Sequence, residues 1–106
     1  MREVKGYWQN YIDGAWVDGG AGRIDVINPG TGEKIAEQAL ADARDVDLAV
    51  QAAKRVHSTG VLTDMRPVER GRIVQAMGRY LLEHLEEIAA LLSLEQGKPI
   101  WEARIE

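Results

Sequence analysis

The pattern of hydrophobic and polar residues changes its period near residue 42. Before that point, short runs of alternating apolar and polar residues predict strands over about residues 10–40. After it, apolar residues recur with the spacing of one helix face, which predicts amphipathic helices over about residues 42–106. The sequence therefore predicts N-terminal β-hairpins followed by helices.

Turn signals divide the strand region into two pairs of strands. Asp13-Gly14 lies between YI and AWV and is the strongest short-range signal for a hairpin. The stretch NPGTGEK at 28–34 separates IDVIN from KIAEQAL, which predicts a second strand pair. Between the two pairs, the residues DGGAGR at 18–23 predict a flexible link.

NPGTGEK also resembles a phosphate-binding loop, because it holds two glycines and a lysine. A Walker-type loop requires lysine directly after its second glycine, then a hydroxyl residue, at the start of a helix. Here Glu33 follows Gly32, no hydroxyl residue follows Lys34, and strand patterns flank the stretch. We interpret it as a turn in which Gly30 and Gly32 accept positive φ.

Start and stop signals divide the helical region. Asp42, with Asp45 three positions later, resembles a capping box, and a first helix is expected to end by Gly60. Pro67 suits the first position of a second helix, and Gly97 provides a stop signal. The second helical pattern is long enough for two helices with a bend near 83–86, and WEARIE starts another helix. The apolar face of the second helical pattern consists of Ile73, Val74, Met77, Leu81, Leu85, Ile88 and Leu92.

Composition excludes several classes of function. The 106 residues form one domain or part of one. A net charge of −4 provides no basic field that would attract nucleic acid or an anionic membrane. No apolar run approaches the roughly 20 residues of a membrane span, and MREVKGYWQ lacks the core of a signal peptide, so we expect a cytoplasmic protein. The absence of cysteine excludes disulfides, thiolate ligands and thiol nucleophiles within these residues.

The histidines and glutamates are weak candidates for chemistry. His57 and His84 are far apart and lack neighbouring ligands at metal-binding spacing. Three acidic residues, Glu83, Glu86 and Glu87, could suggest a catalytic acid cluster, but acidic residues on the outer face of an amphipathic helix are usually solvated. The residues themselves predict neither a metal centre nor an acid–base pair.

Two tryptophans and one lysine leave alternatives open. Trp8 and Trp16 near the hairpin are expected to be packing residues, although they could form a platform for a stacked ligand. Lys98 could contact an anion or simply complement a helix dipole. The residues by themselves indicate a piece of an α/β protein without its own chemistry.

Five stretches in order and spacing carry a family resemblance: YIDGAWV, VINPGTGEKIAE, DVDLAVQAAK, PVERGRIV and LEQGKPIWEAR. They resemble the N-terminal region of the aldehyde dehydrogenase superfamily over residues 8–106. The resemblance implies a partial segment, 1–106, of that family's α/β cofactor-binding domain, which would be α+β as an isolated fragment.

The family resemblance implies oxidation of aldehydes to carboxylic acids with NAD or NADP through a cysteine. This chain has no cysteine, and the family's oxyanion, base and cofactor motifs are also missing from it. We therefore expect a scaffold portion with no catalytic and no cofactor-binding residue, inactive on its own. Arg66 replaces a serine cap common in the family, which should weaken the following helix start.

The resemblance also implies a structural monovalent cation. In many members it is held by the carbonyl before Asn-Pro and by an acidic residue in the D/E-x-G-K-P motif. Those positions match Ile27 and Glu95 here. Carbonyl and carboxylate oxygens suit a hard cation.

An alternative interpretation is a stand-alone interaction or oligomerisation module derived from this scaffold. Its apolar helix face and the strand edges around IDVIN and KIAEQAL would be available for contacts. The expected partner is a second copy or a full-length subunit, with neither nucleic acid nor membrane.

Overall fold

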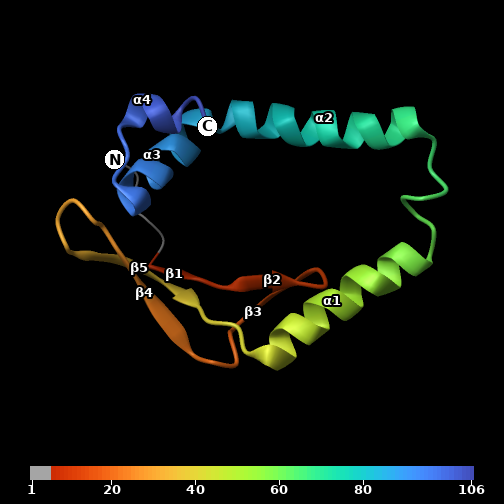
Figure 1. Ribbon diagram of the computed structural model, residues 1–106, viewed down its shortest axis with the longest axis horizontal. Helices are drawn as coiled ribbons and strands as arrows, with labels where there is room; N and C mark the ends of the chain where they lie inside the picture. The colour runs from red at the N-terminus through yellow and green to blue at the C-terminus, as the bar shows by residue number, and fades with distance from the viewer. Residues whose placement is uncertain (1–5) are drawn as a thin grey trace. The chain divides into compact units, whose positions relative to one another are not determined.

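The computed structural model describes residues 6–106 and divides into two compact units. The first contains residues 6–27 and 34–61, and the second contains 28–33 and 62–106. Strands and the first helix form the first unit, and three further helices belong to the second (Figure 1). Among residues 6–106, no helix combines the length and the apolar character needed to cross a bilayer.

The predicted first hairpin is confirmed. Strands β2 (Asn10–Ile12) and β3 (Ala15–Val17) pair antiparallel through the two-residue turn Asp13-Gly14. Asp13 has φ 53° and Gly14 has φ 80°, the two positive values that a type I′ turn requires. The hairpin therefore forms where its local turn chemistry predicts it.

The second strand pair is also confirmed, but it belongs to a larger sheet. Strands β4 (Arg23–Ile27) and β5 (Lys34–Ala39) pair antiparallel around the predicted turn. Strand β1 (Tyr7–Trp8) lies outside the predicted strand region and pairs parallel with β5, giving the order β1-β5-β4 (Figure 1). The expectation that both β4 and β5 present free edges is wrong, because β5 is the central strand.

The segment at 18–23 is a bonded turn and not the expected flexible link. Gly19 and Gly22 form an isolated antiparallel bridge, and the amide of Ala21 donates to the carbonyl of Leu40 at 3.0 Å. The amide of Gly20 donates to the Asp45 carboxylate at 2.7 Å. These contacts attach the turn to the start of the first helix.

Helix α1 (Ala43–Ser58) begins at the predicted capping box. The Asp42 carboxylate accepts from the Asp45 amide at 2.9 Å, and the Asp45 carboxylate accepts from the Asp42 amide at 3.0 Å. The reciprocal bonds satisfy two amides that the helix itself leaves without partners. α1 lies beside the β2–β3 hairpin (Figure 1).

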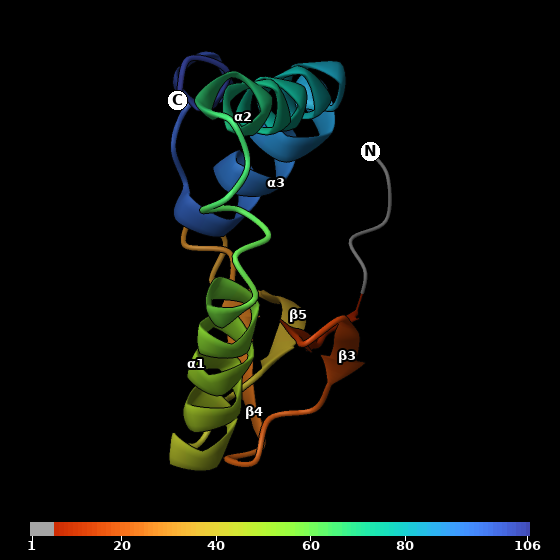
Figure 2. The ribbon, with the colours of Figure 1, turned by 90° about the vertical axis from the view of Figure 1, so that its right-hand side faces the viewer.

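The long helical pattern is two helices, as predicted. Helix α2 (Pro67–Glu83) and helix α3 (Leu85–Gln96) are separated at His84, and α3 ends at Gly97 with φ 74°. The short helix α4 (Ile100–Ala103) follows and packs beside α3 (Figure 2). The left-handed conformation of Gly97 explains why glycine ends α3.

The start of α2 keeps half of a capping box. The amide of Arg66 donates to the Glu69 carboxylate at 3.2 Å, and the guanidinium of Arg66 reaches the same carboxylate at 2.9 Å. A guanidinium accepts no hydrogen bond, so the side chain of Arg66 cannot cap the amides of the first turn. Glu69 thus compensates in part for the missing serine.

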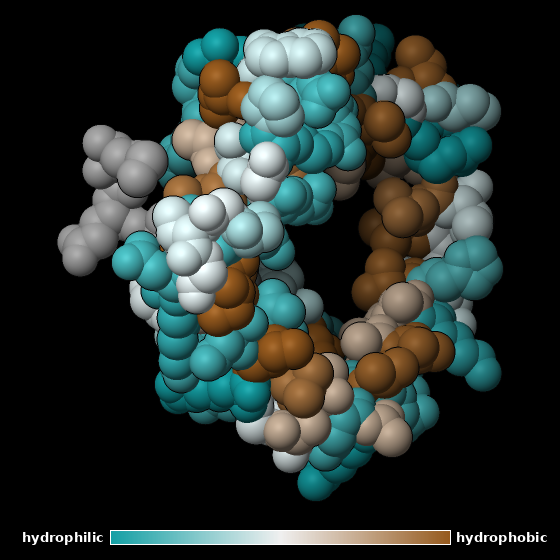
Figure 3. Space-filling view, turned by 60° about the vertical axis from the view of Figure 1, so that its left-hand side comes forward, coloured by the Kyte–Doolittle hydropathy of each residue, from teal (hydrophilic) through white to brown (hydrophobic). Residues whose placement is uncertain are grey.

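The buried apolar residues are small. Among the described residues, the buried hydrophobic ones are Ala36, Ala39, Ala89 and Ala103. Large hydrophobic residues reach solvent in both units, and brown surfaces lie open between teal ones in the space-filling view (Figure 3). Five members of the predicted apolar helix face are exposed: Ile73, Val74, Met77, Leu81 and Ile88.

Candidate functional site

The turn at 28–33 is closed by its own hydrogen bonds. The Asn28 side chain accepts from the Gly30 amide at 2.8 Å, and the Asn28 carbonyl accepts from the Gly32 amide at 2.8 Å. The Asn28 amide in turn donates to the Glu33 carbonyl at 2.9 Å. Gly32 has the expected positive φ of 75°, but the expectation for Gly30 is wrong, because the Asn28 side chain stabilises it within an Asx turn.

This turn does not provide the donors of a phosphate loop. An anion cradle needs backbone amides that point outward and a free cation. The amides of Asn28, Gly30 and Gly32 are bonded inside the turn, and proline has no N–H. The Lys34 ammonium lies 2.8 Å from both Asp25 and Glu37. The arrangement supports the interpretation of NPGTGEK as a turn.

The two most specific motifs of the sequence meet within the second unit. A Cβ placed on Gly97 would lie 2.9 Å from the Pro29 side chain, which is closer than real Cβ contacts. Gly97 therefore meets two requirements at once, a positive φ of 74° and close contact with the turn. The NPGTGE and LEQGKP motifs thus support one another as backbone structure.

The two residues of the predicted cation site lie in different elements. Ile27 is the last residue of β4, and Glu95 lies in the last turn of α3 with its side chain exposed. Across residues 6–106, histidine, cysteine, aspartate and glutamate form no group of three able to hold a metal ion. A monovalent cation at Ile27 and Glu95 stays a prediction.

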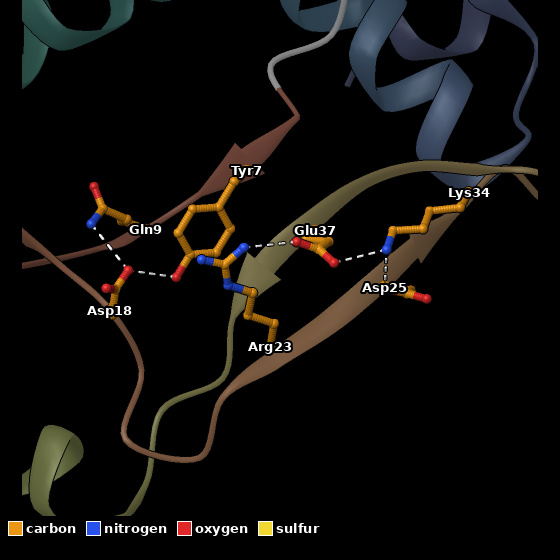
Figure 4. A network of polar contacts seen from close by, with 7 residues as sticks. All are labelled: Tyr7, Gln9, Asp18, Arg23, Asp25, Lys34 and Glu37. Carbon is orange, nitrogen blue, oxygen red and sulfur yellow. Dashed lines mark hydrogen bonds and ion pairs between the residues drawn. The ribbon is translucent and has the colours of Figure 1, made fainter.

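A chain of polar contacts follows the three-stranded sheet (Figure 4). The Asp18 carboxylate accepts from the Tyr7 hydroxyl at 2.7 Å and from the side-chain Nε2 of Gln9 at 3.1 Å. The Arg23 guanidinium lies 3.8 Å from the centre of the Tyr7 ring and donates to Glu37 at 3.0 Å. These contacts connect β1 to β4 and β5, the other two strands of the sheet.

The network holds its acidic groups in the charged form. Hydrogen bonds from Lys34 and then Arg23 lower the pKa of Glu37, and the Tyr7 hydroxyl, followed by Gln9, lowers the pKa of Asp18. The bond to Asp18 raises the pKa of Tyr7. A general acid or base requires a pKa near the working pH, and these shifts lead away from it. The network is therefore structural.

The histidines and the acidic cluster are dispersed along the helices. His57 lies in the last turn of α1, whereas His84 stacks on Tyr80 with ring centroids 4.3 Å apart. The Glu86 carboxylate binds the Arg104 guanidinium at 2.9 and 2.8 Å, and this bond lowers the pKa of Glu86. Glu86 therefore has a structural partner, which the expectation of a solvated face did not include.

The aromatic and lysine candidates also have partners. The Trp16 and Tyr11 rings contact each other across the hairpin, with centroids 4.9 Å apart and planes tilted by 60°, and each residue is about 60% exposed. Lys98 forms an ion pair with Glu106. The cross-strand pair fits the packing interpretation of Trp16, since such pairs stabilise hairpins.

The hairpin and α1 enclose an open cavity of about 370 Å³ that the sequence patterns did not predict. An ion pair of 2.5 Å between Arg55 and Asp13 borders it, and Ile12, Val17 and Leu48 contribute apolar wall. The cavity depends on a contact between distant segments, so no local signal indicates it. Its lining includes no nucleophile paired with a base.

Comparison with known proteins identifies the relatives of this segment. A profile of the aldehyde dehydrogenase family matches residues 16–106. The chain is 42% identical over 96 residues to N-succinylglutamate 5-semialdehyde dehydrogenase of Burkholderia thailandensis, covering 91% of this chain and 19% of that protein. It is 41% identical over 99 residues to malonate-semialdehyde dehydrogenase 1 of Oceanobacillus iheyensis, covering 92% and 20%. The chain thus spans about a fifth of these relatives.

Solved structures match the same segment. The NAD-dependent aldehyde dehydrogenase from Sinorhizobium meliloti aligns with a TM-score of 0.87 at 38% identity, over 96% of this chain and 21% of that one. A double mutant of betaine aldehyde dehydrogenase from Staphylococcus aureus, in complex with NAD+, aligns with a TM-score of 0.92 at 31% identity. That match covers 99% of this chain and 22% of the other. The fold class expected from the resemblance is confirmed.

Proposed function

The chain belongs to the aldehyde dehydrogenase family, and we propose that it is the N-terminal scaffold portion of an NAD(P)-dependent aldehyde dehydrogenase. One observation carries the proposal. The two specific motifs, NPGTGE and LEQGKP, contact each other through Pro29 and Gly97. The amides of Asn28, Gly30, Gly32 and Gly97 donate to protein acceptors, and Lys98 pairs with Glu106. The segment supports a fold and contributes no reacting group.

The chain by itself is expected to be inactive. Aldehyde oxidation in the family that it resembles requires a cysteine nucleophile, because a thiolate attacks the carbonyl and forms a thioester after hydride transfer. These 106 residues contain no cysteine. The purified chain should therefore form no NADH or NADPH with any aldehyde. Aldehyde-dependent formation of either cofactor by a homogeneous sample would contradict this expectation.

A chimera tests the scaffold role directly. Residues 8–106 would replace the matched segment of the Sinorhizobium meliloti enzyme, which is 38% identical. We expect the chimera to oxidise the recipient's aldehydes with unchanged preference, because the segment contributes backbone support and no substrate contact. A folded chimera without activity, or one with a different preference, would show that the segment does more than support the fold.

A second candidate function is an interaction or oligomerisation module, in which the chain acts by binding a second copy or a full-length subunit. The exposed large hydrophobic residues favour it, since soluble monomers seldom expose contiguous apolar patches beyond a few hundred Å². Light scattering coupled to size exclusion distinguishes the cases. A single species at 11.8 kDa would contradict self-association.

A further inference from the structure

The chain contains two aspartates that are followed directly by glycine, in the pairs Asp13-Gly14 and Asp18-Gly19. The first pair is the turn of the β2–β3 hairpin, and the second begins the turn at 18–23. In such a pair the glycine nitrogen can attack the aspartate side chain and form a five-membered succinimide, because glycine has no side chain that hinders the approach. Since the two pairs are alike in sequence, their surroundings decide which of them reacts.

Succinimide formation requires a neutral carboxyl group and a peptide that can rotate. A bond forms between the glycine nitrogen and Cγ of aspartate, the bond from Cγ to the carboxyl hydroxyl breaks, and that hydroxyl leaves with the amide hydrogen as water. Water then opens the ring at one of its two carbonyls. Opening at Cγ restores aspartate, whereas opening at the main-chain carbonyl leaves the chain running through Cγ, which is isoaspartate. Mass is conserved, and neither an oxidant nor a reductant takes part.

The Asp13-Gly14 peptide is open to this reaction. The Asp13 side chain is 58% exposed and forms an ion pair with the Arg55 guanidinium at 2.5 Å. An exposed ion pair holds its groups weakly, because water competes for both charges. A Cβ on Gly14 would meet no atom within 4 Å. Space is therefore available for the Gly14 nitrogen to turn toward Cγ of Asp13.

The Asp18-Gly19 peptide is held at both of its residues. The Asp18 carboxylate accepts hydrogen bonds from the Tyr7 hydroxyl and from the Gln9 side chain (Figure 4). The bond from Tyr7, followed by that from Gln9, lowers the pKa of Asp18, so its neutral form is scarcer. A Cβ on Gly19 would lie 2.1 Å from the Leu40 carbonyl oxygen. The close backbone of Leu40 therefore restricts rotation of the Asp18-Gly19 peptide.

We propose that Asp13 is a modification site at which isoaspartate forms spontaneously, and that the fold directs this reaction to Asp13 and away from Asp18. All the contacts that distinguish the two sites lie within the first unit. The inference goes beyond the proposed scaffold function and does not depend on it. The modified chain is a substrate for enzymes that methylate the free carboxylate of isoaspartate.

Isoaspartate at position 13 alters the hairpin and its contact with α1. It adds one methylene group to the main chain of a two-residue turn, whose positive φ values of 53° and 80° match the twist of the paired strands. The free carboxylate is then attached directly to Cα, which draws it away from the Arg55 guanidinium on α1. The modification therefore weakens both the turn and its ion pair with the helix.

Incubation of the complete 106-residue chain at mildly acidic pH, with and without urea, tests the inference. Peptide mapping with electron-based fragmentation distinguishes isoaspartate from aspartate at each position, and an isoaspartyl methyltransferase measures the total. Without urea, isoaspartate should form about tenfold or more faster at Asp13 than at Asp18, because reaction at Asp18 must break two hydrogen bonds to its charged carboxylate. In urea the two rates should become similar, since both sets of contacts are lost.

Two variants complete the test. Tyr7→Phe removes one bond to Asp18 but keeps the ring beside Arg23, and it should speed the reaction at Asp18 severalfold without changing that at Asp13. Asp13→Glu should abolish the reaction at position 13, because its ring would have six members. Equal rates at the two sites without urea, or a faster reaction at Asp18, overturn the inference. A preference for Asp13 that persists in urea also overturns it, because the neighbouring residues and not the fold would then set the rates.

Discussion

Two glycine-rich turns of this chain, at 18–23 and 28–33, look similar in sequence, but Gly19 in the first and Gly32 in the second are glycine for different reasons. A Cβ on Gly19 would lie 2.1 Å from the Leu40 carbonyl oxygen, so this position needs glycine because another backbone segment is close. Gly32 has no atom within 4 Å of its Cβ position but has φ 75°. The requirement for glycine at Gly19 comes from space, and at Gly32 it comes from backbone conformation.

The comparison shows how a glycine motif can suggest phosphate binding without providing it. In the first turn the amides of Gly20 and Ala21 donate to Asp45 and Leu40, and in the second the amides donate within the turn. Anion binding depends on which amides remain free, and a count of glycines does not reveal this. Substitutions that separate space from conformation test the distinction.

The largest effect is expected for Gly19→Ala. The new methyl group requires the Leu40 backbone to move, which strains the packing and weakens the hydrogen bond from the Ala21 amide to the Leu40 carbonyl. We expect the unfolding free energy to fall by about 3 kcal/mol. Urea denaturation followed by circular dichroism measures the change. Gly6→Ala is the control, since its Cβ meets no atom within 4 Å and it is not a positive-φ position. A loss near that of the control would show that the close contact is unimportant.

Gly32→Val should lower the unfolding free energy by about 1–3 kcal/mol, because a β-branched residue resists positive φ. Gly32→Asn should cost less, since asparagine tolerates the left-handed conformation. Nucleotide affinity should remain at background in both variants and in the unmodified chain. Measurable nucleotide binding that Gly32→Val abolishes would instead revive the phosphate-loop hypothesis.

A smaller effect is expected at the helix cap that contacts the first turn. Asp42→Ala should cost about 1 kcal/mol through loss of the cap of α1, whereas Asp42→Asn should cost little. A Cβ on Gly20 would lie 2.1 Å from the Asp42 carboxylate. Gly20→Ala should therefore be less harmful when Asp42 is already alanine. Additive losses in the double variant would contradict this coupling.

The smallest effect is the pH dependence of the first turn. Bonds from the Gly20 amide and then the Asp42 amide lower the pKa of Asp45 below its ordinary value of 3.8. Because the pKa is lowered in the folded state, ionised Asp45 stabilises the fold at pH values above 3.8. This contribution is lost as the pH falls below 3.8 through the folded pKa. Denaturation at stepped pH should show the loss, and Asp45→Asn should remove it. The cost of Gly32→Val should not depend on pH in the same range.

Local chemistry made part of the fold predictable from sequence. The Asp13-Gly14 hairpin, the Asp42 capping box and the stop at Gly97 depend on neighbouring residues, and each is present. The pairing of β1 with β5 and the contact of Gly19 with Leu40 depend on distant segments, which periodicity does not reveal. The candidate cation site could be predicted only from the family resemblance, because the spacing of Ile27 and Glu95 in the sequence does not by itself identify a cation site.

The parallel pairing of β1 sets an order of events during synthesis. Tyr7 pairs with Glu37 and Trp8 with Gln38, whereas β4 and β5 are joined by a short turn. Closing the short loop costs less entropy, so the β4–β5 hairpin can form first and β1 adds afterwards. At about 5–20 residues per second, a ribosome needs on the order of seconds to supply the partner of Tyr7. We therefore expect β1, the first strand of this sheet to be made, to be the last to join it.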